Sequence, residues 1–137
     1  MNGFKTFTAG FVSTILFHQG LLALLHAAGL TARTAYAVTL TQPLHLPAFV
    51  SLALWGGLWA LALGYLVRGL SLRRRWAGWV ILGALLPSLV AWFVVFPLKG
   101  LPVAGGWAPE VLALGLLLNA AWGFGVALLS SLARFRA

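Results

Sequence analysis

The sequence contains no cysteine, and its 137 residues include a single acidic residue, Glu110. Without cysteine, the chain has no disulfide, no thiolate nucleophile and no cysteine-ligated metal or redox centre. One carboxylate provides no acid–base pair, and neither a Gly-rich phosphate loop nor a Ser-His-Asp arrangement is apparent. We therefore expect a protein that is not an enzyme and that carries no cofactor.

Histidine is scarce as well, and the three histidines are poorly spaced for a metal or a haem. His18 and His26 are eight residues apart, and His45 follows much later in the chain. A separation of eight residues places two side chains about 80° apart around a helix. The i, i+4 pair that sets two ligands on one face is missing, and no carboxylate accompanies the imidazoles. We expect no metal site.

Charged residues make up 7% of the chain, whereas 62% of the residues are hydrophobic and the mean hydropathy is +1.01. A soluble domain of this length leaves much of its surface in water and has no means of hiding so much apolar area. The net charge is +8, but the basic residues lie between apolar runs instead of along a solvated face. This pattern favours contact with the lipid bilayer and its headgroups over nucleic acid, which we do not expect as a partner.

Four apolar segments are long enough to cross a bilayer core, which takes about 20 helical residues. They cover residues 7–30, 46–67, 76–98 and 107–132. The first is longer than the apolar region of a cleaved signal peptide, and His18 and Gln19 interrupt it, so we interpret it as a retained helix. The sequence predicts an all-α membrane protein, a bundle of four transmembrane helices that forms one domain over residues 1–137.

The basic residues predict the orientation of the bundle. With four spans, the two termini and the central Arg-rich loop share one side. Two of the nine basic residues, Arg33 and Lys99, lie on the other side. The side of the termini holds the remaining seven: Lys5, Arg68, Arg73, Arg74, Arg75, Arg134 and Arg136. The positive-inside rule therefore predicts a multi-pass protein of the bacterial inner membrane with both termini in the cytoplasm.

The two halves of the chain resemble each other, which indicates two repeated helical hairpins. Residues 9–12 (AGFV) match residues 77–80 (AGWV) at an offset of 68, and the Trp-Gly pair 55–56 matches 122–123 at an offset of 67. Common membrane residues also match by chance, so the duplication stays a hypothesis. Two-span repeats would be related by an axis along the membrane normal.

Small residues at helical spacing mark faces suited to close packing in lipid. They occur in every span: Gly10, Ser13 and Gly20; Gly56, Ala60 and Gly64; Gly83, Ala84 and Ser88; and Gly115, Asn119, Gly123 and Ala127. A plain four-helix bundle uses all these faces internally. The alternative is that one face remains for a partner helix.

Polar residues are expected at similar depth in three of the spans. At about 1.5 Å per residue, His18 lies about 20 Å from Lys5, close to the membrane midplane. The layer comprises His18, Gln19, Ser88 and Asn119, with Trp55, Trp59 and Trp122 near it. One interpretation is a structural hydrogen-bonded layer between helices. The other is a cavity lined by imidazole, amides and indoles, with His18 as the intramembrane ionisable group.

At the outer side the charged candidates are Glu110 and Lys99. Glu110 follows Pro109 at a helix start, where the helix dipole stabilises an acid. An ion pair with Lys99 or Arg33 at an outer mouth is the alternative.

The chain resembles uncharacterised small four-span inner-membrane proteins of bacteria. The resemblance is carried by Phe17-His18-Gln19-Gly20, by Phe96-Pro97-Leu98-Lys99-Gly100 with Val103 to Trp107, and by Asn119-Ala120-Ala121-Trp122-Gly123. It implies the four-span fold and no activity. Small drug exporters also have four spans, but they use a carboxylate in the first helix that this chain lacks.

Two functions fit these observations. The polar layer and the repeat favour a small transporter or channel for a neutral or lipophilic solute, acting as a homodimer because four spans are few for a pathway. The short loops, the small-residue faces and the shortage of ionisable groups favour an accessory or assembly subunit that binds another membrane protein.

Overall fold

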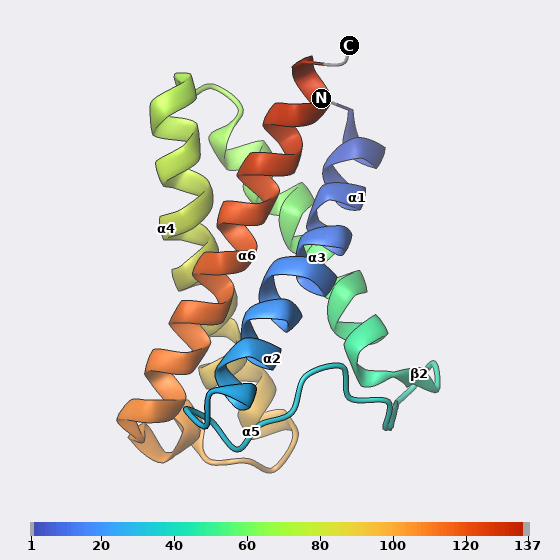
Figure 1. The fold of residues 1–137 in the computed structure, drawn as a ribbon, viewed down its shortest axis with the longest axis vertical. Helices are drawn as coiled ribbons and strands as arrows, with labels where there is room; N and C mark the ends of the chain where they lie inside the picture. The colour runs from blue at the N-terminus through green and yellow to red at the C-terminus, as the bar shows by residue number, and fades with distance from the viewer. Residues whose placement is uncertain (1, 136–137) are drawn as a thin grey trace.

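The computed structural model describes residues 2–135 and confirms the all-α bundle (Figure 1). Four helical segments are long and apolar enough to cross a membrane. The first comprises α1 (Gly3–Ser13), the π-helical turn η1 (Thr14–His18) and α2 (Gln19–Ala27), and the second is α3 (Ala48–Val67). The third comprises α4 (Leu72–Val90), the π-helical turn η2 (Ala91–Val95) and α5 (Phe96–Leu98), and the fourth is α6 (Pro109–Phe135).

The first span lies nearer the N-terminus than the predicted range 7–30. It begins at Gly3 because Asn2 caps it, accepting a 2.9 Å hydrogen bond from the backbone N–H of Lys5. It ends at Ala27 because Gly29 follows with φ +74°, the left-handed conformation that terminates helices. The observed ends of the other spans differ from the predicted ends by a few residues. Helix α6 begins at Pro109, where the missing N–H costs nothing.

The prediction of a central Arg-rich loop is wrong in one respect. Arg73, Arg74 and Arg75 belong to the first turn of α4, and only residues 68–71 separate α3 from α4. Arginine is a good helix former, so an apolar helix continues into the headgroup region through these residues. The Arg75 guanidinium turns back and donates to the carbonyl oxygens of Arg68 (3.1 Å) and Leu70 (3.0 Å), which closes the turn.

The connection between the first two spans contains structure that the sequence did not predict. Strands β1 (Leu40–Thr41) and β2 (Leu46–Pro47) pair antiparallel, with Leu40 opposite Pro47. The connection before α6 holds a short turn, η3 (Val103–Trp107), with left-handed backbone at Ala104, Gly105 and Gly106. Both connections lie at the end of the bundle opposite the termini (Figure 1). We call this the loop end and the opposite one the terminal end.

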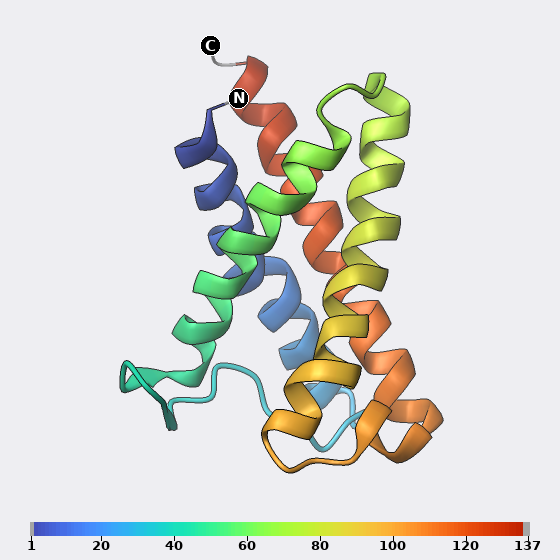
Figure 2. The same ribbon diagram turned by 180° about the vertical axis from the view of Figure 1, so that it is seen from behind.

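The helices pack as two hairpins, with α1 along α3 and α4 along α6. Helix α6 also packs on α1 and is therefore central, whereas α3 and α4 meet near their connecting turn and diverge toward the loop end (Figure 2). The buried core is formed by Ala9, Ala60, Leu63, Val67, Trp79, Trp122, Val126 and Ala127. Helix α3 is consequently an edge of the bundle.

Equivalent glycines lie where the two helices of each hairpin approach closely. A Cβ on Gly56 would lie 3.1 Å from the carbonyl oxygen of Gly10, and one on Gly123 would meet the carbonyl of Trp79. Gly56 and Gly123 are the positions that the repeat relates. The predicted packing role of these small residues is therefore realised inside the bundle, and the correspondence supports the duplication hypothesis.

Candidate functional site

His18 and Gln19 lie where the first span changes from π-helical to α-helical geometry. The side-chain oxygen of Gln19 accepts a 2.8 Å hydrogen bond from the backbone N–H of Tyr36. Its Nε2 atom therefore faces the ring of His18 and lies 3.1 Å from Nδ1. Because an amide nitrogen only donates, Nδ1 of His18 is the acceptor and the ring is neutral with its proton on Nε2.

Tyr36 brings the long connection back along the first span. Gln19 lies eight residues before the helix end at Ala27, which corresponds to about 12 Å of helix. The Tyr36 hydroxyl reaches one turn further and donates to the carbonyl of Ile15 at 2.8 Å. Its ring packs edge-on against Phe49 of α3 at a centroid distance of 5.9 Å. The two hydrogen bonds give polar groups of this non-helical segment a partner beside the span, which polar backbone groups at membrane depth require.

A second polar pair joins α4 to α6. The side-chain amide of Asn119 donates a 2.9 Å hydrogen bond to the hydroxyl of Ser88, and that hydroxyl donates to the carbonyl of Ala84 at 2.6 Å. Ser88 is buried and Asn119 is half-buried. The two predicted residues therefore form an interhelical link in which both polar groups have a partner.

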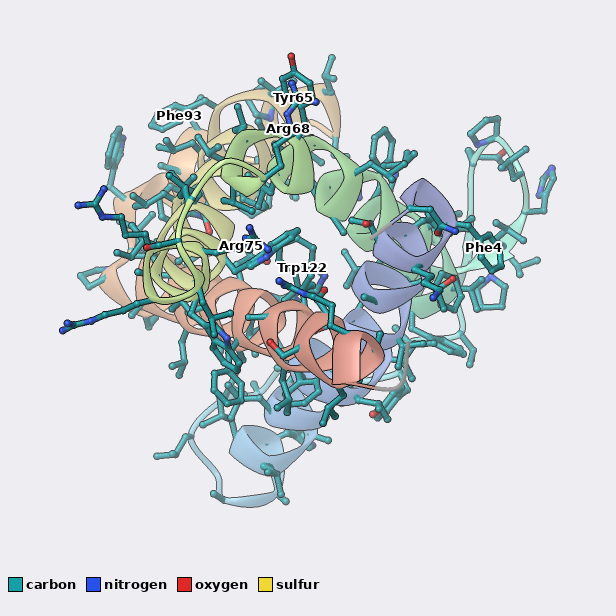
Figure 3. All side chains as sticks on the ribbon, turned by 90° about the horizontal axis from the view of Figure 1, so that it is seen from above. Phe4, Tyr65, Arg68, Arg75, Phe93 and Trp122 are labelled. Atoms are coloured by element: carbon teal, nitrogen blue, oxygen red, sulfur yellow. The ribbon has the colours of Figure 1, made fainter. Side chains whose placement is uncertain are left out.

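The third polar contact centres on Trp122, which points into the middle of the bundle (Figure 3). Its indole N–H donates to the carbonyl of Gly10 at 3.0 Å, and its own carbonyl accepts from the hydroxyl of Ser13 at 2.7 Å. Thr14 also donates to the carbonyl of Gly10, at 3.0 Å. This reciprocal pair fastens α6 to α1.

The other two predicted tryptophans have different surroundings. Trp59 is half-buried and packs against the core, whereas Trp55 is 60% exposed on α3. The predicted layer is thus divided: His18 lies with Gln19, and Ser88 with Asn119. Among residues 2–135 no hydrogen bond connects these two pairs.

Two contributing residues, Tyr36 and Thr14, were missed from the sequence. Tyr36 lies in a connection whose return along the helix has no sequence signal. Gly10 and Ser13 were expected on a packing face of the first span, and Thr14, four residues after Gly10, was a usable signal for the same helix contact.

The charged candidates at the loop end are solvent-exposed. Glu110 lies in the first turn of α6, as predicted, and Lys99 follows α5. Within the described part of the chain, no group of three potential metal ligands comes together.

Two surface grooves lie away from the predicted polar layer. The larger, about 540 Å³, lies between α4 and α6 and is lined by Val80, Ile81, Ala84, Leu85, Ala113, Leu116, Leu117 and Ala120. The smaller, about 280 Å³, lies between α1 and α6 near the terminal end and includes Phe4, Lys5 and Leu129. Neither contains His18, Gln19, Ser88 or Asn119.

The fold and these contacts define a small membrane-spanning protein of four helices, in which polar contacts join α4 to α6 and α6 to α1, and a third ties the long connection to the first span. No family model, curated protein or solved structure matches the chain.

Proposed function

We propose that this protein is a non-catalytic assembly subunit that acts by contacting other helices within the membrane. The observation that carries the proposal is how the polar groups at membrane depth are used. Gln19, Asn119 and Trp122 each bind a group of a neighbouring segment. A pathway for a solute needs such groups directed at the solute, whereas here they hold helices and the long connection in place.

The protein offers its surroundings mainly apolar surface. In each span at most 33% of the most apolar 18-residue window is buried. The loops are short, apart from the connection between the first two spans, and that connection is tied down by Tyr36. This surface therefore favours association with other helices in lipid, through packing and interhelical hydrogen bonds.

We infer that the terminal end faces the cytoplasm of a bacterial cell and that the membrane is the inner one. The support is the distribution of charge, since Arg68, Arg73, Arg74 and Arg75 cluster at that end. The chain lacks cysteine, so single-cysteine variants report orientation directly. A membrane-impermeant maleimide added outside intact cells should label Thr34→Cys and leave Ser71→Cys unlabelled. The reverse pattern would overturn the orientation.

The assembly role is tested by purification from the native membrane in a mild detergent. We expect another membrane protein to co-purify at constant stoichiometry through successive columns. If the partner-free chain is the dominant cellular species, the proposal fails.

A second candidate function is passage of a small neutral solute. It is favoured by His18, whose Nε2–H has no hydrogen-bond partner in the described chain and which ends a π-helical turn, a feature frequent at functional sites. On this view, His18→Ala should abolish flux in reconstituted vesicles, while Trp107→Phe, an exposed change at the loop end, should not. Equal flux with both variants would remove His18 from any pathway.

A further inference from the structure

We propose that a second copy of this chain packs against α3 along a stripe formed by Ser51, Trp55, Leu58 and Ala62. The inference rests on the proposed assembly function and names the first partner. Residues spaced by four, three and four lie along one side of a helix. Trp55 is 60% exposed, Leu58 is 48% exposed, and the small residue Ala62 is also exposed.

Most of the stripe faces away from the bundle, and Ser51, at its end nearest the helix start, is half-buried. The side of α3 that faces the bundle carries Ala53, Gly56, Gly57, Ala60, Leu63 and Val67, all buried. At 100° per residue, the centre of that set lies about 180° from Ser51. Within residues 2–135, α3 packs mainly on α1, and it meets α4 only near their connecting turn (Figure 2).

Trp55 is the residue that sets this face apart from ordinary lipid-facing surface. It lies seven residues after Ala48, about 10 Å along the helix from its start. Among residues 2–135, its indole N–H has no acceptor, and an unpaired donor in hydrocarbon is costly. In the repeat-related Trp122, by contrast, the indole N–H donates a hydrogen bond to the carbonyl of Gly10. A partner of α3 therefore has to present an acceptor at this depth.

A second copy presents that acceptor at the right level. Two copies related by a two-fold axis along the membrane normal place their α3 helices parallel, with every residue at the depth of its equivalent. Helical side chains lean toward the N-terminus, so the Trp55 indole covers the turn that contains Ser51. The Ser51 hydroxyl makes no hydrogen bond within the described chain. Each copy thus offers one donor and one acceptor, and the contact is self-complementary.

Cross-linking in native membranes tests this geometry. The chain has no cysteine, so any disulfide between copies reports the one position introduced. Under mild oxidation, Leu58→Cys and Ala62→Cys should form dimers, while Ile81→Cys should stay monomeric. Ile81 is a matched control because it is 56% exposed on α4, away from the stripe. Cross-linking at Ile81 in place of Leu58, or at none of the three, would overturn the inference.

The hydrogen bond is tested separately by dimer dissociation in bilayers. Trp55→Phe keeps an aromatic ring but removes the donor, and Ser51→Ala removes the acceptor. Each should weaken dimerisation about fivefold to tenfold, because two interhelical hydrogen bonds are lost per dimer. The double variant should be no weaker than either single variant. Additive losses, or none, would contradict the pairing.

The outcomes separate this inference from the function on which it rests. A complex with another membrane protein in which this chain is present once would leave the assembly role intact and reject the second copy. A dimer that cross-links at Leu58 and carries no other protein would support the second copy and reject the role in a larger complex.

Discussion

The indole nitrogen of Trp122 on α6 donates to the backbone carbonyl of Gly10 on α1 across 3.0 Å, although the two residues are 112 positions apart. Gly56 of α3 lies beside this contact: a Cβ at Gly56 would lie 3.1 Å from the indole nitrogen and 3.1 Å from the carbonyl oxygen of Gly10, so the glycine leaves room for the hydrogen bond. The contact joins the first helix of one hairpin to the second helix of the other. It is therefore the clearest link between the two halves of the chain.

Replacing Trp122 by Phe should destabilise the folded bundle by about 0.6–1.7 kcal/mol, because the ring remains but the interhelical hydrogen bond is lost. Unfolding in mixed micelles, followed by the loss of helical signal, measures the change. The matched control is Trp55→Phe, the same substitution at the repeat-related position, where the indole is exposed. Equal losses of monomer stability at both positions would contradict the assigned contact.

Replacing Gly123 by Ala should cost about 1–3 kcal/mol, because the added Cβ meets the backbone carbonyl of Trp79, which has little room to move. Gly69→Ala should have little effect, since no atom lies within 4 Å of the added Cβ. The same unfolding assay compares the two. If Gly123→Ala is tolerated as well as Gly69→Ala, α4 and α6 do not cross at this point.

Removing the Gln19 side-chain amide should release the long connection. In Gln19→Leu the Tyr36 N–H loses its acceptor, and leaving such a group unpaired costs about 1–3 kcal/mol. Trypsin should then cut after Arg33 about tenfold faster or more. Tyr36→Phe removes only the hydroxyl contact with Ile15 and should have a smaller effect.

Lys99, in the other connection at the same end, provides the internal control for that experiment. Cleavage after Lys99 should stay constant in both variants. Faster cleavage at both sites would indicate general unfolding instead of local release.

Asn119 and Ser88 should show a measurable coupling. In a double-mutant cycle of Asn119→Leu and Ser88→Ala, the interaction term should be about 0.6 kcal/mol, the usual value for a hydrogen bond between membrane helices. A cycle that pairs Asn119→Leu with Ser131→Ala should give no coupling, since Ser131 bonds to the carbonyl of Ala127. A negligible term for the first pair would show that the contact adds nothing to the fold.

Much of the fold follows from the sequence because a bilayer imposes a simple length rule. Four apolar runs predicted four spans, and glycines such as Gly56 and Gly123 marked the close approaches. Helix ends were displaced where capping by Asn2 or the continuation of α4 through its arginines overrode hydropathy.

The candidate site was harder to predict, because depth along a helix does not determine direction around it. His18 and Asn119 were placed at one level, yet each bonds to a different neighbour. Trp55 and Trp122 look alike in sequence, but α6 is covered on two sides and α3 is an edge. The return of Tyr36 along the first span is a tertiary contact and has no periodic signature.

The central claim is that this protein works by association within the membrane. Native mass spectrometry of material released directly from its own membrane tests it most directly. We expect species that contain two copies of the 14.6 kDa chain, bound at fixed stoichiometry to another membrane protein. A population made up chiefly of the single chain, with no protein bound, would contradict the claim.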